Sequence, residues 1–275
     1  MNKFISISSI KPRYFTFAFP LGLLLCIFFL LYLFDSLSIK GYIHLQKEWF
    51  YFINHYVSQH PELLFNLTQF GDALIFLSFL TLFILYTPKL WESLLTGSLI
   101  SMVVALLLKE LFAIPRPAKA FDYKTFHIIG EKLSGSTSFP SGHSITIFTI
   151  LTILMFVFAP KRKSYKISYV ITTVSIGLLF AFTRVAVGAH YPLDVFIGCV
   201  LGYISGLLGL CITHKYRLWP WIYNKKYYPL FLLLFLSCCI VLIWRILQEN
   251  LFIYYCALGS LCYSSYKITK IYVQK

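Results

Sequence analysis

Residues 15–34 read FTFAFPLGLLLCIFFLLYLF, without a single charged side chain. A helix that crosses the hydrocarbon core of a bilayer needs about 20 mostly apolar residues. A cleaved signal peptide has a shorter apolar core, of about 7–15 residues, followed by a cleavage site of small residues. This run follows Lys11 and Arg13 and ends at Asp35 with no such site. The sequence therefore predicts a retained membrane-spanning helix.

The composition also indicates a membrane protein. Of the 275 residues, 59% are hydrophobic and 12% are charged, whereas soluble domains carry about 25% charged residues. Seven further apolar runs are long enough, or nearly so, to cross a bilayer. They cover residues 72–87, 93–112, 143–159, 168–188, 193–212, 229–246 and 251–266. The sequence thus predicts an all-α, polytopic bundle of eight membrane helices.

The formal net charge of +14 raises the question of a nucleic-acid partner. Most of the basic residues stand in short loops between the apolar runs, a pattern that orients membrane proteins and attracts anionic lipid headgroups. Nucleic-acid binding is therefore not expected. If eight spans alternate from a cytoplasmic N-terminus, Glu92 is the one acidic residue left inside. We expect both termini in the cytoplasm and segments 35–71 and 113–140 outside, with Trp49 to Phe52 in the membrane interface.

A first cluster of polar residues stands at the outer end of run 93–112. Lys109 lies in its last turns, and Arg116 follows between two prolines, which end the helix. Two cations at this place could clamp one phosphate, with the guanidinium binding two of its oxygens. The alternative is that Lys109 only reaches for the interface and Arg116 anchors the helix end.

A second cluster is Pro140-Ser141-Gly142-His143, directly before an apolar run. Ser141 is a good helix cap, and Gly142 lets an anion approach the free backbone N–H groups of the first turn. His143 would then stand beside a bound phosphate. A plain helix cap followed by an interfacial histidine is the alternative.

A third cluster joins the runs 168–188 and 193–212. Arg184 ends the first of them, and His190 precedes the second, with Asp194 four residues further on. A carboxylate that accepts the N–H of one imidazole nitrogen leaves the other nitrogen free to attack. The alternative for Asp194 is an acidic residue that complements the helix dipole.

The three clusters together hold the groups that phosphoryl transfer needs. Three cations and a helix N-terminus stabilise the charge on the phosphate oxygens. His190 is the candidate nucleophile and His143 the candidate acid for the leaving oxygen. Carboxylates are not clustered for magnesium or zinc, so neither a metal nor another cofactor is expected.

The order and spacing of these residues resemble the three-part signature of the type-2 phosphatidic acid phosphatase superfamily. The parts are Lys109-(six residues)-Arg116-Pro117, Pro140-Ser141-Gly142-His143 and Arg184-(five residues)-His190-(three residues)-Asp194. The resemblance implies a six-helix core, a metal-free phosphohistidine mechanism and an active site on the non-cytoplasmic side. It assigns His190 as nucleophile, Asp194 as its partner and His143 as general acid. The phosphate binders that it implies are Lys109, Arg116, Ser141, Gly142 and Arg184.

Two features depart from the pattern of that family. Thr183 stands where the family usually has serine, so a hydroxyl is kept with an added methyl group. We expect residues 1–212 to form the six-span core and residues 213–275 to add a basic loop and a C-terminal transmembrane hairpin. Packing or anchoring is the preferred role of this hairpin, and a role in substrate access is the alternative.

The sequence therefore predicts a lipid phosphatase of a bacterial inner membrane. Its substrates would be lipid phosphates or diphosphates, such as undecaprenyl diphosphate, phosphatidylglycerol phosphate, phosphatidic acid or the phosphates of lipid A. A lipid phosphotransferase would use the same residues with a lipid hydroxyl in place of water. A non-catalytic lipid-binding or transport protein is the third hypothesis, and it does not require the complete set of reactive groups.

Overall fold

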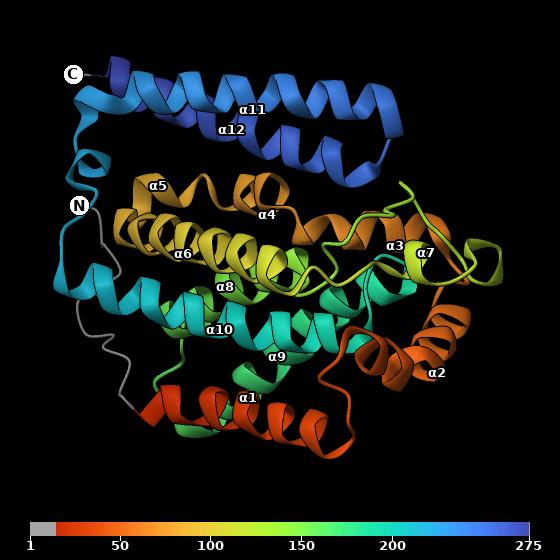
Figure 1. Ribbon diagram of the computed structural model, residues 1–275. Coiled ribbons are helices and arrows are strands. Elements are labelled where there is room, and N and C mark those ends of the chain that lie inside the picture. The colour runs from red at the N-terminus through yellow and green to blue at the C-terminus, as the bar shows by residue number, and fades with distance from the viewer. Residues whose placement is uncertain (1–14, 275) are drawn as a thin grey trace.

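A computed structural model describes residues 15–274, and this part of the chain is helical without β-strands (Figure 1). The N-terminal basic residues used for the predicted orientation lie outside the described residues. The long helices are α1 (Phe15–Leu33), α6 (Pro88–Phe112), α8 (Gly142–Val157), α9 (Lys163–Ala186), α10 (Pro192–Lys215), α11 (Tyr228–Glu249) and α12 (Phe252–Val273). The others are α2 (Ile39–Val57), α3 (Pro61–Thr68), α4 (Ala73–Leu80), α5 (Phe83–Tyr86) and α7 (Pro117–Ala120).

Fewer helices than the eight predicted spans are long and apolar enough to cross a membrane. Within residues 15–274 there are five, or six if a bent pair counts as one span. The five contain α1, α6, α9, α10 and α11. The predicted spans 143–159 and 251–266 are also helices, but α8 has only 16 residues and α12 is less apolar. The chain is thus an all-α, multi-pass membrane protein.

The predicted span 72–87 is not one continuous helix, which corrects the expectation from the sequence. It consists of α4 and α5, and α4 is bent by 75° relative to the helical segment Pro61–Gly71 before it. Between α4 and α5, the backbone bonds from Thr81 to Ser78 and from Ile84 to Thr81 reach back three residues instead of four. The Thr81 hydroxyl also donates to the Ser78 carbonyl at 2.8 Å, which satisfies that oxygen locally.

Helix α10 lies against α8 at a distance that only small residues allow. Glycines recur every four residues on the face that meets α8, at 198, 202 and 206. A methyl group at Gly202 would stand 2.4 Å from the Ile145 carbonyl oxygen, well inside van der Waals contact. Such stripes of small residues let helix backbones approach in membranes, where packing rather than the hydrophobic effect drives association.

Helices α11 and α12 form a C-terminal hairpin that packs beside α4, on the opposite side of the bundle from α1 (Figure 1). Polar contacts hold the hairpin in place at several points along its length. The Ile253 N–H donates to Asn66 Oδ1 at 2.9 Å, and Ser260 Oγ donates to the Ser78 carbonyl at 2.9 Å. A third contact, of 2.8 Å, joins the hydroxyls of Thr81 and Ser264.

The predicted outer segment 35–71 is largely helical, and α2 lies at one end of the bundle near α3 and α7 (Figure 1). The expectation that Trp49 to Phe52 all lie in the interface is wrong for Phe50. Phe50 is fully buried and packs edge-on against Tyr191 and Phe126, whereas Trp49 is 65% exposed. The cause is the period of α2, which turns every fourth residue toward the bundle.

Candidate active site

The ends of four helices meet at the end of the bundle that α2 covers, and these ends and the segments beside them carry the predicted site residues. The C-terminal ends of α6 and α9 bring Lys109 and Arg184, and the N-terminal ends of α8 and α10 bring His143 and Asp194. The connecting segments add Arg116 and His190. The N–H of Ser141 donates to the Asp194 carbonyl at 3.0 Å, which ties the start of α8 to the start of α10.

His190 is buried, with its two ring nitrogens in different surroundings. Nδ1 lies 2.7 Å from the backbone carbonyl oxygen of Ser138. A carbonyl oxygen can only accept, so Nδ1 carries the proton and Nε2 keeps its lone pair. Nε2 lies 3.3 Å from Nη1 of Arg116, a position where a cation would also meet the oxygens of a phosphate.

The surroundings of His190 keep its ring neutral. Burial lowers the pKa of His190 well below its ordinary value of 6.5, and the nearby cations Arg116, Arg184 and Lys109 lower it further. The imidazole is therefore unprotonated at neutral pH. A neutral imidazole is the form that can act as a nucleophile.

Asp194 is fully buried and accepts hydrogen bonds from three groups. Tyr42 Oη donates to Oδ1 at 2.7 Å, while Ser138 Oγ and the Tyr191 N–H donate to Oδ2 at 2.5 and 3.0 Å. The sequence predicts a direct bond from His190 to this carboxylate, but Nδ1 lies 3.6 Å from Oδ2. Asp194 thus reaches His190 mainly through Ser138, whose hydroxyl it binds and whose carbonyl holds the ring.

The two arginines of the site are buried, and each is held by a different neighbour. Arg116 is held by the Ala189 carbonyl, at 3.2 Å from Nη1. Arg184 Nη1 donates to Thr68 Oγ1 at 3.0 Å, and its buried Nε has no hydrogen-bond partner. Buried donors are nearly always paired, so the free Nε of Arg184 marks a place for an acceptor such as a phosphate oxygen.

The N-terminus of α8 brings three predicted residues into the site. Ser141 is buried and caps the helix, since its Oγ accepts from the Ser144 N–H at 3.4 Å. A methyl group at Gly142 would lie 3.4 Å from Lys109 Nζ, so the ammonium group stands over the first turn. His143 packs against Gly71, where an added methyl group would come within 2.4 Å of its Cβ.

Known proteins are similar to this chain in sequence and in fold. Residues 89–218 match the sequence model of the PAP2 superfamily. The crystal structure of Aquifex aeolicus LpxE superposes with a TM-score of 0.51 and 27% identity, covering 62% of this chain and 96% of that chain. Residues 89–218 are a PAP2 superfamily region. This confirms the family resemblance, with the first and last residues of the three-part motif inside the matched range.

Curated relatives of the PAP2 region carry phosphatase names. The lipid A 1-phosphatase of Rhizobium etli is 31% identical over 154 residues, which cover 53% of this chain and 62% of that protein. The undecaprenyl-diphosphatase of Sulfolobus acidocaldarius is 27% identical over 185 residues, which cover 64% of this chain and 84% of that protein. The chain thus matches less than two thirds of the length of the Rhizobium relative.

Sequence reasoning missed residues of α2 that hold the PAP2 site from outside the motif. Besides Tyr42, Gln46 Oε1 accepts the Leu193 N–H at 2.7 Å at the start of α10. Asn54 Nδ2 donates to the Ala186 carbonyl at 2.8 Å at the end of α9. The signal for these residues is the four-residue spacing of Tyr42, Gln46, Phe50 and Asn54, which a helical reading of this segment would have placed on one face.

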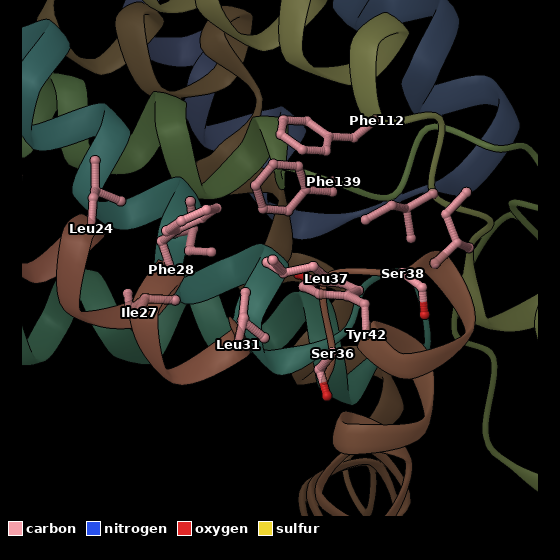
Figure 2. A pocket seen from close by; sticks show the side chains of 13 residues that line it. Leu24, Ile27, Phe28, Leu31, Ser36, Leu37, Ser38, Tyr42, Phe112 and Phe139 are labelled. Carbon is pink, nitrogen blue, oxygen red and sulfur yellow. The ribbon is translucent and has the colours of Figure 1, made fainter. Parts of the chain in front are cut away.

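Two pockets flank the site. The polar pocket has a volume of about 540 Å³ and lies between His143 and Arg184 on one side and Arg245 of α11 on the other. The apolar pocket of Figure 2 has about 230 Å³. Leu24 and Phe28 of α1 line it together with Phe112, Phe139 and Tyr42, as the figure shows. Within residues 15–274, no three His, Cys, Asp or Glu side chains gather so as to hold a metal ion.

Proposed function

We propose that this chain is an integral membrane phosphatase that hydrolyses a lipid phosphate or diphosphate monoester through a phosphohistidine intermediate. One observation carries the proposal. The carbonyl of Ser138 fixes the proton of His190 on Nδ1, and this leaves the lone pair of Nε2 beside the guanidinium of Arg116. A neutral, oriented imidazole next to a phosphate-binding cation is what nucleophilic attack on phosphorus requires.

The reaction has two steps. His190 Nε2 forms a bond to phosphorus while the bond from phosphorus to the lipid oxygen breaks, and His143 gives that oxygen its proton. Arg116, Arg184 and Lys109 stabilise the charge on the equatorial oxygens. Water then attacks the phosphohistidine, returns a proton to His143 and releases inorganic phosphate. The peptide N–H groups at the start of α8 provide further donors for the anion.

The names of the relatives support a lipid as the substrate. They include a lipid A 1-phosphatase, an undecaprenyl-diphosphatase and, over a short match, a phosphatidylglycerophosphatase B. All three names describe phosphate or diphosphate groups on lipids. A site at the ends of membrane-spanning helices suits such substrates, because the headgroup reaches the site while the chains stay in the bilayer.

The proposed location is a bacterial inner membrane, with the site facing the periplasm or exterior. The basic loop residues support this orientation, since Lys161, Arg162 and Lys163 stand at the end of the bundle away from the site. Positively charged loops remain on the cytoplasmic side. Both termini would then lie in the cytoplasm.

The test is phosphate release by purified protein in detergent, with phosphatidic acid, undecaprenyl diphosphate and lipid A each supplied alone. The wild-type chain should release phosphate from at least one of them without a second lipid as acceptor. His190→Ala should lower kcat at least about 10³-fold, as expected for loss of a nucleophile. Because the phosphorus–nitrogen bond of phosphohistidine hydrolyses in acid, the reaction should be quenched at alkaline pH. A radiolabelled phosphoryl group should then be found on wild-type protein and be absent from His190→Ala.

The matched control is His44→Ala, which removes an exposed histidine of α2. It should keep the activity and the trapped label. Full phosphate release by His190→Ala would refute the proposed nucleophile. No release from any of these lipids by the wild-type chain would refute the proposed function as a whole.

A further inference from the structure

We propose that the C-terminal hairpin completes the active site by forming a binding site for a hydroxyl-rich headgroup, such as a sugar, on the leaving-group side of the phosphate. The inference rests on the proposed function. The model of the PAP2 superfamily ends at residue 218, before α11 begins at Tyr228. The hairpin nevertheless lines the polar pocket together with His143 and Arg184.

The histidines define which side of the phosphate this pocket occupies. In an in-line displacement, the nucleophile and the leaving oxygen lie on opposite sides of phosphorus. His143, the proposed acid for the leaving oxygen, lines the polar pocket, and His190 does not. Arg184, whose buried Nε has no hydrogen-bond partner, also lines this pocket. The alcohol that leaves must therefore lie in the polar pocket.

The hairpin is held firmly enough to form a wall of this pocket. Arg245 of α11 donates to Asp72 Oδ2 at 2.8 Å, and Asp72 itself caps α4. Near the turn of the hairpin, Tyr254 Oη donates to Glu249 Oε2 at 2.8 Å. The bond from Arg245 to Asp72 joins the hairpin to the part of the chain that carries Gly71, the neighbour of His143.

The chemistry of the outer wall selects the headgroup. It combines the carboxylates of Asp72, Glu131 and Glu249 with the donors of Arg245 and the amide of Gln248. A hydroxyl group both donates and accepts, so it can pair with every member of this wall. The esters of diacylglycerol only accept hydrogen bonds, so they offer no donor to the carboxylates.

A diphosphate substrate fits this wall less well. Its leaving group is a lipid monophosphate, which would bring negative charge beside three carboxylates. The guanidinium of Arg245 is already engaged by Asp72. The repulsion between this phosphate and the carboxylates would disfavour binding of a diphosphate lipid. Trp244, 61% exposed at the rim, offers a flat apolar surface for the ring of a sugar.

The experiment compares two monophosphate lipids with matched acyl chains in the same preparation of full-length protein. One is a diacylated glucosamine 1-phosphate whose amine is acylated, and the other is phosphatidic acid. Wild-type protein should show a higher kcat/KM for the sugar lipid. Gln248→Ala should lower the ratio of the two kcat/KM values about three- to tenfold, the effect of losing a typical hydrogen bond, and Trp244→Ala should lower it too.

The ratio does not depend on the fraction of folded protein, because both lipids meet the same sample. Leu247→Ala is the control, since this residue lies on the same turn of α11 but is exposed and outside the pocket. It should leave the ratio unchanged. A wild-type preference for phosphatidic acid, or an unchanged ratio in both pocket variants, would overturn the headgroup site while phosphate release still supports the phosphatase. Absence of release from every lipid would overturn both.

Discussion

At the scale of single residues, the protonation of His190 sets the pH range in which the site can work. Burial, with help from Arg116, holds the pKa of His190 below 6.5. The group must be neutral to attack, so the acidic loss of activity follows this lowered pKa. We expect the acidic limb of kcat/KM to lie below pH 6.5, which a pH profile with a soluble short-chain lipid phosphate would measure.

The pH profile also contains the titration of the substrate, because the second ionisation of a phosphate monoester lies near pH 6. Titrating the lipid phosphate alone provides the correction. An enzyme limb that stays above pH 6.5 after this correction would contradict the environment described for His190.

A second residue-scale prediction concerns Tyr42, whose hydroxyl donates to Asp194. Tyr42→Phe removes this bond and leaves a carboxylate oxygen buried without it, while the ring can still pack against Phe139. Hydrogen bonds to charged groups contribute about 1.5–3 kcal/mol. We expect kcat to fall about tenfold or more, with KM changed less, in steady-state assays. The control is Tyr51→Phe on the same helix, which removes a hydroxyl that bonds to Thr125 instead of Asp194. This variant should not have the effect.

The grouping of the candidate site residues was predictable because their types and spacing are specific, but the residues that position them were not. Motif spacing places His190, His143 and Asp194 near one another. It cannot show that a carbonyl, that of Ser138, holds the histidine ring, because every residue has a carbonyl and the sequence does not distinguish this one. Tyr42 is missed for another reason, since it is 152 positions away from the carboxylate that it binds.

At the scale of helices, the close contact of α8 and α10 depends on glycine. Gly202→Ala places a methyl group against the Ile145 carbonyl and must push the helices apart. Overpacking of this kind costs about 1–3 kcal/mol. We expect the apparent Tm in detergent to fall by several degrees, and phosphate release to fall as well, because both helices carry site residues at their N-terminal ends.

The control is another glycine in a long helix. An added methyl group at Gly259 in α12 meets no atom within 4 Å, so Gly259→Ala should keep or raise the Tm. An equal loss of stability in both variants would show that the contact at Gly202 is not the cause.

Most long helices were predictable because the length and hydrophobicity of a membrane span can be recognised in the sequence. The segment 72–87 has the right hydrophobicity, but its bend depends on backbone bonds around Thr81 and on a contact with Ser264 of the hairpin. Helix α2 was not predicted because the apolar and polar faces of an amphipathic helix average to a low mean hydropathy. Its period, rather than its mean hydropathy, is the useful signal.

For the whole molecule, the proposed orientation can be tested by labelling cysteines from one side of the membrane. Lys124→Cys lies in an exposed loop at the site end, and Lys163→Cys lies at the exposed start of α9 at the other end. Because the basic segment at α9 should stay in the cytoplasm, a membrane-impermeant maleimide should label Lys124→Cys in intact spheroplasts. Lys163→Cys should react only after permeabilisation.

The parent chain, whose cysteines at 26 and 262 are exposed, measures the background in this experiment. The reverse pattern of labelling would place the site in the cytoplasm.

The length of α8 has a consequence for where in the bilayer the chemistry takes place. With 16 residues, the helix is about 24 Å long, which is about 6 Å less than the hydrocarbon core of a typical membrane. Its N-terminus, with His143, therefore lies about one helical turn below the level of the lipid headgroups if its other end reaches the opposite boundary. In that placement, a lipid phosphate moves about 6 Å below the headgroup level before it can react. Bilayer thickness thereby sets how far each substrate must travel, and a thinner membrane shortens the path.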